Sequence, residues 1–573
     1  MRRVLFAVAL VGMSAISHAQ FTKEEQAALS DALFISNLSL ADLSRSRATA
    51  GTPWTLNATA DPNKGLEALS ALSNSIKSGT PYQLLAHLRT EYFADGQLPS
   101  EEPVSAEVPD DVPAELRDSV SRLAKAILTC NERIRQGLQK LSPTERRTLI
   151  EAAPRFASLE AEPTFDFVKQ PLPSRTEFNS LIAKVDFKYI RWAGQGLSQA
   201  LQLEIPKLRE SARQGFAGNL RATVEGVTVE IGGIGDDRHH ENDVVLAIDL
   251  GGNDHYSGRY GAGVGYGSLC IDLGGDDNYE GPDLALGAGA FGVGLLYDMQ
   301  GDDVYRGKSI SLGSGIGGVG ILYDDQGNDD FRTASLSAGF GAWGIGICSD
   351  SQGIDRYLSR TNSQGSARDF GVGILFDRSG EDDYRAAAGK CGSQGTGMGP
   401  GGFGLLLDAA GDDRYNAGYM VQGYGGSEGV GALMDEGGAD VYVGAASCQG
   451  VGVGMGAGYL VDSVGQDTYL VTQSPGQGFG GDRGMGVLLD RSGDDLYAGG
   501  ESHPAAAVGN GVAIFIDAGG DDRYQGPTGI GSMARGSGSL AAFVDLSGQD
   551  RYFEGLSDGQ AKVESSWGSS LDI

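Results

Sequence analysis

One phrase, Asp-x-x-Gly-x-Asp-x-Tyr, returns twelve times along the chain and limits the possible folds more than any other feature. The copies run from Asp249–Tyr256 to Asp545–Tyr552 and follow one another at steps of 23 to 31 residues. Both aspartates and the glycine are present in every copy, and the ring is tyrosine except at Phe331. A repeat this regular indicates a stack of similar structural units.

Each unit divides into a short apolar run and a turn. Three apolar residues precede the first aspartate, as in Leu295-Leu296-Tyr297 and Ile514-Phe515-Ile516. Such a run between turn residues predicts a strand buried on both faces. A glycine precedes the run in eight copies, from Gly294 to Gly486, and indicates close approach of another backbone. Gly-x-Asp then forms a tight turn, and the tyrosine begins the next strand.

A unit of about 27 residues is too short for a propeller blade of about 40 residues but suits one coil of a β-solenoid. We therefore expect a mainly β fold: a parallel β-solenoid (β-helix) of about twelve coils over residues 223–556, with a degenerate first coil around Gly232–His239 and a C-terminal tail at 557–573. An irregular barrel or a propeller with two units per blade is the alternative. Glutamines followed by glycine predict an amide ladder along the stack. They are Gln364, Gln394, Gln422, Gln449 and Gln477.

Stacking would align the aspartates in two columns. Neighbouring carboxylates one strand apart repel by ~3–4 kcal/mol at an effective dielectric near 20. Protonation, outward splay into water, or a shared cation can relieve this repulsion. Because Asp in a turn accepts backbone N–H groups, we expect the first aspartate to cap the turn. For the second we expect Ca²⁺, which binds carboxylate and carbonyl oxygens, with the residue before it as an extra oxygen ligand. The tyrosine column is expected to be stacked packing.

The turns Gly275–Tyr279 and Gly520–Tyr524 resemble part of the calcium-binding nonapeptide of repeats-in-toxin (RTX) proteins. That family's parallel β-roll binds Ca²⁺ in its glycine-rich turns, through the Asp of each repeat and neighbouring carbonyls. The resemblance implies twelve metal ligands in this chain. They are Asp254, Asp277, Asp303, Asp329, Asp355, Asp382, Asp413, Asp440, Asp467, Asp495, Asp522 and Asp550.

The first 19 residues have the parts of a secretory signal peptide. Arg2-Arg3 precede an apolar run from Val4 to Met13, and Ser17-His18-Ala19 supplies the small residues of a cleavage site. We expect a secreted, periplasmic or cell-surface protein. A later run of about 20 apolar residues is absent from the sequence, so we expect no transmembrane helix.

Residues 20–222 predict a separate α-helical domain. Only eight of the 91 glycines fall within the first 200 residues. Thr22 with Glu25, Ser142 with Glu145 and Ser174 with Glu177 have the spacing of capping boxes, which begin helices. We expect this domain to be a cap or docking piece for the solenoid.

Charge and cysteine content narrow the partners. A net charge of −31 disfavours nucleic acid and anionic lipid and leaves divalent cations, with a cell-surface glycan or an envelope protein as further partners. The five cysteines are too sparse for a disulfide scaffold, and Cys270 and Cys348 occupy repeat positions where small core hydrophobes are expected.

These patterns favour an exported, calcium-stabilised, non-enzymatic rod with a structural or adhesive role at the cell envelope or outside the cell. The alternative is a glycan-binding or polysaccharide-cleaving solenoid enzyme, which would need a pair of carboxylates flanking a glycosidic bond. His239, His240 and His255 form the one irregular cluster, although adjacent histidines on a strand point to opposite faces. Glu501 with His503 is an isolated second pair.

Overall fold

A computed structural model describes residues 21–35, 38–43, 52–99, 106–158, 172–240, 243–386, 394–499, 504–532, 538–553, 556–565 and 567–573. Eight α-helices lie in the first part of this described chain. Their bounds are α1 (Lys23–Ile35), α2 (Pro53–Ala58), α3 (Pro62–Ser78), α4 (Pro81–His87), α5 (Arg117–Gly137), α6 (Pro143–Ala157), α7 (Arg175–Ile182) and α8 (Phe187–Ala212).

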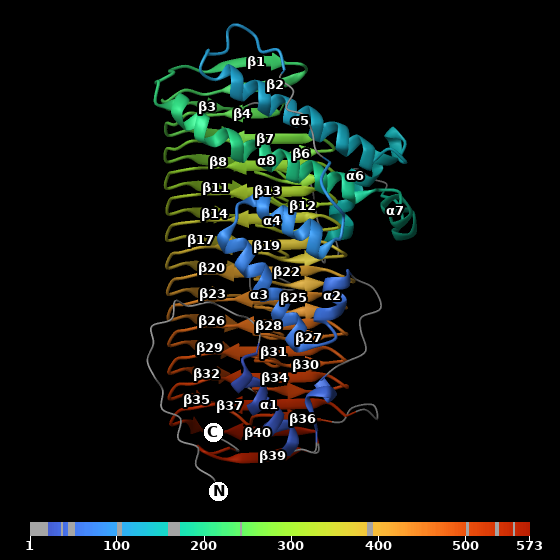
Figure 1. Cartoon of the computed structure of the whole chain (residues 1–573), viewed down its shortest axis with the longest axis vertical. Helices are drawn as coiled ribbons and strands as arrows, with labels where there is room; N and C mark the ends of the chain where they lie inside the picture. The colour runs from blue at the N-terminus through green and yellow to red at the C-terminus, as the bar shows by residue number, and fades with distance from the viewer. Residues whose placement is uncertain are drawn as a thin grey trace.

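The remainder is a parallel β-solenoid built from three long sheets (Figure 1). Sheet A comprises, in spatial order, β1 (Leu220–Val224), β2 (Val227–Ile231), β4 (Leu246–Ile248), β7 (Gly267–Ile271), β10 (Val293–Tyr297), β13 (Val319–Tyr323), β16 (Ile345–Ser349), β19 (Val372–Asp377), β22 (Phe403–Asp408), β25 (Val430–Met434), β28 (Ala457–Val461), β31 (Met485–Asp490), β34 (Val512–Asp517), β37 (Leu540–Asp545), β40 (Gly568–Asp572) and β39 (Ala561–Ser565).

The other two sheets contain shorter strands. Sheet B comprises β3 (Arg238–His239), β5 (His255–Ser257), β8 (Asn278–Gly281), β11 (Val304–Gly307), β14 (Asp330–Arg332), β17 (Arg356–Ser359), β20 (Asp383–Ala386), β23 (Arg414–Asn416), β26 (Val441–Gly444), β29 (Thr468–Val471), β32 (Leu496–Gly499), β35 (Arg523–Tyr524) and β38 (Arg551–Tyr552). Sheet C comprises β6 (Gly263–Val264), β9 (Gly289–Ala290), β12 (Gly315–Ile316), β15 (Gly341–Ala342), β18 (Ala367–Arg368), β21 (Gly397–Met398), β24 (Gly425–Gly426), β27 (Gly452–Val453), β30 (Gly480–Gly481), β33 (Ala506–Ala507) and β36 (Ile530–Gly531).

From β4 to β37 the chain passes from sheet A to B to C in each coil, and each strand pairs in parallel with the equivalent strand of a neighbouring coil. The solenoid has about eleven turns with a repeat of about 27 residues. Equivalent residues are in register, as Val293 with Val319 and Tyr305 with Phe331 show. The solenoid prediction is therefore confirmed, and the barrel and propeller alternatives are wrong because successive units stack along one axis.

The central residues of the inner sheet A strands are mostly apolar because both faces of the sheet are buried there. In β10, Leu296 points into the solenoid interior and packs with the tyrosine column, whereas Leu295 belongs to the core shared with the helices. Cys270 and Cys348 take the interior position of Leu296 in their own coils, as predicted, and the four cysteines within the described residues are free thiols. This double burial explains why the sheet A strands lack an alternating polar pattern.

The helices cover sheet A along the length of the solenoid instead of capping one end (Figure 1). The Trp54 ring packs against Phe403 with ring centroids 4.4 Å apart and planes tilted by 56°, and the Tyr459 hydroxyl donates to the Ala58 carbonyl at 2.8 Å. Near the first coils, a Cβ at Gly194 of α8 would lie 2.9 Å from the Val319 side chain. The three predicted capping boxes are all present at helix starts.

Both ends of sheet A finish in antiparallel strands. β1 pairs antiparallel with β2, and β39 pairs antiparallel with β40, which itself continues the parallel stack. The residues we expected to be a tail therefore extend the sheet, and the first strand begins at Leu220, inside the predicted helical range.

The predicted signal peptide, residues 1–19, lies outside the described residues, as do Cys391, Glu501 and His503. Within the described part, no helix is both long enough and apolar enough to cross a membrane.

Candidate metal centre inside the solenoid

Both aspartate columns face the interior of the solenoid. The aspartates of one column occupy the same position in every coil, and because the strands before them are in register, their side chains line up. All twenty-four motif aspartates are at most 8% exposed. The outward splay considered from the sequence is therefore excluded: the carboxyl groups are enclosed between sheets A and B.

The first aspartate of each motif closes the turn after its sheet A strand. Asp272 Oδ1 accepts the N–H of Gly274 at 2.8 Å, two residues ahead, which confirms the predicted cap. Its Oδ2 accepts the hydroxyl of Tyr256 from the preceding coil at 2.5 Å. The same tyrosine–aspartate bond recurs along the stack, for example between Tyr415 and Asp435 at 2.6 Å.

The second aspartates form a hydrogen-bonded ladder. The backbone N–H of each donates to Oδ1 of the equivalent aspartate one coil ahead, as from Asp277 to Asp303 at 2.6 Å. Eleven such bonds of 2.6 or 2.7 Å connect Asp254 to Asp550. The structure thus brings all twelve predicted ligands into one column.

The other oxygen of these aspartates lacks a partner. Within the described residues, Oδ2 has no hydrogen bond in eleven of the twelve second aspartates, and in the twelfth, Asp303, Tyr305 approaches Oδ2 at only 3.5 Å. Buried polar atoms are normally hydrogen-bonded, so a column of unpartnered carboxylate oxygens indicates a missing ligand or shared protons.

The unpartnered oxygens lie in repeated acidic triads. Each triad joins the second aspartate of one coil to both aspartates of the next, as in Asp277, Asp298 and Asp303. One oxygen from each member lies within 4.8 Å of the others, and the triads follow one another because each second aspartate belongs to two of them. Sequence reasoning assigned the metal to the second column alone and missed the contribution of the first.

The residue before the second aspartate does not join the triads. Asp302 is exposed and accepts the N–H of Asn328 from the next coil at 2.9 Å, and Asp276 in turn accepts from Asp302 at 3.1 Å. These side chains satisfy turn backbone at the surface, so they are not the extra oxygen ligands that we expected.

The tyrosine column is stacked packing, as predicted. The rings of Tyr384 and Tyr415 lie 4.9 Å apart at 3°. The hydroxyl bond to the first aspartate was missed, although the near-invariance of tyrosine over phenylalanine was a signal for it. Phe331, the one exception, leaves Oδ2 of Asp350 unpartnered within the described residues.

A histidine takes the tyrosine position at the N-terminal end. His239 stacks on Tyr256 at 4.4 Å, and its Nε2 lies 2.9 Å from Asp249 Oδ2. Its Nδ1 lies 3.2 Å from Glu230. Burial alone would lower the pKa of His239, but hydrogen bonds to Asp249 and Glu230 raise it to about 10. The protonated imidazole of His239 thus places a positive charge at the N-terminal end of the aspartate columns. His240, in contrast, is exposed and lies beside His255.

The predicted glutamine ladder has the expected column but different partners. The Gln364 amide donates to the carbonyls of Tyr357 at 2.9 Å and Arg385 at 3.1 Å. Gln422 repeats this with Tyr415 and Val443, both at 3.1 Å. The amides therefore satisfy the backbone of sheet B instead of bonding to one another.

Burial and mutual repulsion change the acidity of both columns. Desolvation, followed by the charges of Asp272 and Asp298, raises the pKa of Asp277 to about 11. Desolvation and Asp377 raise the pKa of Asp355 to about 8. Carboxyl groups in this range stay protonated at neutral pH unless a cation replaces the protons.

No family model, no curated protein and no solved structure matches this chain. The likeness to RTX repeats therefore rests on the turn residues alone. What the structure establishes is a β-solenoid with stacked, buried acidic triads, and ligation of Ca²⁺ by the twelve predicted aspartates stays a prediction.

Proposed function

We propose that this chain is an exported structural or adhesive repeat protein whose rod is stabilised by a file of Ca²⁺ ions between its coils. The observation that carries the proposal is the column of buried Oδ2 atoms, unpartnered within the described residues in eleven of the twelve second aspartates, which lie in triads of acidic side chains. A carboxylate oxygen in such a position needs a proton or a cation.

Charge balance supports a divalent cation. Each coil contributes two buried aspartates, so one divalent ion per coil would neutralise the interior. Without the twenty-four motif aspartates, the net charge of −31 would be −7, an ordinary value for a protein surface. The interior columns therefore account for most of the acidic excess.

The donor set supports Ca²⁺ over transition metals. The triads built from both aspartate columns, such as Asp277 with Asp298 and Asp303, offer only carboxylate oxygens, which are hard ligands. Oxygens around Ca²⁺ lie up to about 5 Å apart, and the triad oxygens lie within 4.8 Å of one another. The RTX-like turns point to the same ion, held here by side chains that face inward.

Calcium titration of the mature chain tests the proposal. After treatment with chelator, isothermal titration calorimetry should show uptake of about one Ca²⁺ per coil, and Ca²⁺ should raise the melting temperature by at least about 10 °C. Mg²⁺ should raise it less because it requires a tighter octahedral site. Absence of Ca²⁺ uptake would show that protons neutralise the columns instead.

Two adjacent aspartates provide a matched pair of variants. Asp303→Asn removes a carboxylate from two triads, whereas Asp302→Asn removes one from the exposed turn. The first should lower Ca²⁺ stoichiometry and reduce the thermal shift, and the second should leave both unchanged. Equal effects of the two variants would contradict an interior site.

Export is the second part of the proposal and rests on the N-terminal sequence. Arg2-Arg3, the apolar run and Ser17-His18-Ala19 support cleavage after Ala19. Outside the cytoplasm, millimolar Ca²⁺ would load weak sites. N-terminal sequencing of protein from the native host should begin at Gln20, and a cell-associated chain beginning at Met1 would contradict export.

The alternative, a polysaccharide-cleaving solenoid, requires two accessible carboxylates. The motif aspartates are enclosed in the solenoid and cannot flank a polysaccharide chain. This burial favours the structural role.

A further inference from the structure

A separate cavity of about 800 Å³ lies where α5 and α6 meet the first coils of the solenoid. Arg146 of α6 and Arg259 of the solenoid line it, together with Arg135 and Arg147. Apolar side chains complete the lining: Ile134, Leu138, Ile150, Val264 and Leu284.

The charge of this cavity is opposite to that of the molecule. The whole chain carries −31, yet the described residues of the lining include four arginines and one acidic residue, Glu151. Positive potential concentrated in a concave, partly apolar site attracts anions.

Two of the four arginines are already neutralised. Arg135 pairs with Glu132 at 2.5 Å and Arg147 with Glu151 at 2.9 Å. In the other two arginines, Arg146 and Arg259, only the Nε atom donates a hydrogen bond, and its acceptor is a backbone carbonyl. Arg146 donates to Leu141 at 3.1 Å and Arg259 to Asp283 at 3.3 Å. Within the described residues neither forms an ion pair, so their Nη groups are available to a ligand.

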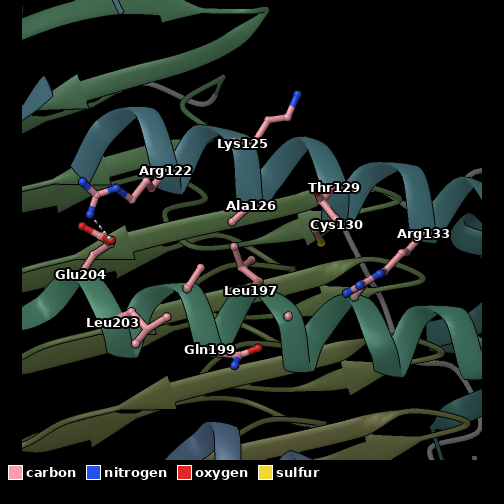
Figure 2. Close-up of a pocket in the computed structure, with 13 residues that line it drawn as sticks. Arg122, Lys125, Ala126, Thr129, Cys130, Arg133, Leu197, Gln199, Leu203 and Glu204 are labelled. Atoms are coloured by element: carbon pink, nitrogen blue, oxygen red, sulfur yellow. Dashed lines mark hydrogen bonds and ion pairs between the residues drawn. The ribbon is translucent and has the colours of Figure 1, made fainter. Parts of the chain in front are cut away.

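A second pocket, between α5 and α8, provides a contrast (Figure 2). Its Arg122 is bonded to Glu204 at 3.2 Å, and its Arg133 donates to the Trp192 carbonyl at 3.0 Å. This pocket is smaller, about 280 Å³, and its Arg122 already has a carboxylate partner. The larger cavity differs because Arg146 and Arg259 form no ion pair with a carboxylate of the described residues.

We propose that this cavity binds a small organic anion with an apolar body, such as a medium-chain carboxylate. The planar guanidinium groups of Arg146 and Arg259 would bind the carboxylate, since arginine matches its geometry with paired N–H donors. The floor of Ile134, Leu138 and Ile150 would receive the hydrocarbon part. The volume lies within the range of small-molecule sites.

Octanoate is a suitable probe, with octanamide as its neutral match. Calorimetry on the mature chain should detect octanoate binding, and octanamide should bind at least tenfold more weakly. Arg146→Gln/Arg259→Gln should weaken octanoate binding at least tenfold. Arg332→Gln/Arg385→Gln, which makes the same charge change on sheet B, should leave it unchanged. Circular dichroism and melting of both double variants verify folding.

Several outcomes would overturn the inference: no octanoate binding to the wild type, equal binding of octanamide, or unchanged affinity in the Arg146/Arg259 variant. Inorganic phosphate binding as tightly as octanoate would show a site for the anion alone, without use of the apolar floor. Should the Arg146/Arg259 variant fail to fold, Val264→Trp, which fills the cavity, should abolish octanoate binding, and retained binding would refute the site. The cavity does not touch the aspartate columns, so these results are independent of the calcium proposal.

Discussion

At the scale of single residues, the interior is held by one repeated hydrogen bond between a tyrosine hydroxyl and an aspartate one coil ahead. Tyr357 donates to Asp377 at 2.6 Å, and Tyr384 one coil ahead and Tyr305 two coils back form the same bond. Phe331 breaks the series, and Asp350 Oδ2 is left unpartnered among the described residues. The phenyl ring still stacks normally, 4.8 Å from both Tyr305 and Tyr357.

Phe331→Tyr should therefore stabilise the protein. The new hydroxyl would reach Asp350 as its neighbours reach their aspartates and add about 1 kcal/mol to the free energy of unfolding. Tyr357→Phe, the reverse change one coil on, should lower that free energy by ~1–3 kcal/mol because Asp377 loses its donor. Urea unfolding measures both. A destabilised Phe331→Tyr would show that the interior has no room for the hydroxyl.

At the scale of the structural elements, the turn between sheets A and B depends on glycine. A Cβ at Gly301 would lie 1.6 Å from the carbonyl oxygen of Gly275, one coil away. The equivalent glycine in each motif faces the same close approach, for example Gly327 against Gly301. Stacking at strand spacing leaves no space for a side chain there, which is why this glycine is present in all twelve motifs.

Gly301→Ala should destabilise the solenoid by ~3 kcal/mol or more, since the Gly275 backbone must move away from the new methyl group. Gly235→Ala is the control, because a Cβ there would have no heavy atom of the described residues within 4 Å apart from its own chain neighbours. Thermal unfolding should separate the two clearly. Equal melting temperatures would mean that the turn can widen without loss.

The N-terminal coil shows how the two aspartate columns end. A Cβ at Gly232, where a first aspartate would stand, would lie 1.6 Å from Asp249 Oδ2, and His239 replaces the tyrosine. His239→Ala would leave Glu230 and Asp249 as buried carboxyl groups without their cation, at a cost of ~3–5 kcal/mol. His239→Tyr, which restores the bond to Asp249, should cost less. Denaturant unfolding of both variants tests this order.

At the scale of the whole molecule, the buried columns couple stability to pH and to cations. Desolvation raises the pKa of Asp355 and Asp413 to about 8, above the ordinary value of an unfolded chain. A folded state that binds more protons than the unfolded state loses stability as pH rises. Ca²⁺ would act in the opposite direction, since it binds the ionised carboxylates and competes with protons.

In chelator, the melting temperature should therefore fall as pH rises from about 4 through about 8. In excess Ca²⁺ it should change little over this range, so the difference between the two conditions should widen with pH. Scanning calorimetry at several pH values measures both series. Parallel curves would contradict cation binding, and a melting temperature in chelator that rises with pH would contradict protonated columns.

The amino-acid sequence by itself determined the stack. Twelve in-register copies, an apolar run before each first aspartate and a glycine before the run in eight copies leave few arrangements other than a parallel solenoid, because every coil must repeat the same contacts. The turn cap of the first aspartate and the stacking of the tyrosines were also predictable, since both are local or follow from register.

Tertiary structure alone decided which way the carboxyl groups face and what covers the rod. The repeat determines that the aspartates align in columns. The closure of sheets A and B around these columns buries them and brings aspartates of both columns together in triads. Likewise, capping boxes locate helix starts, whereas contacts such as that between Trp54 and Phe403 place the helices along sheet A. The contacts between the helices and sheet A join residues hundreds of positions apart, so the sequence pattern around either residue does not predict the contact.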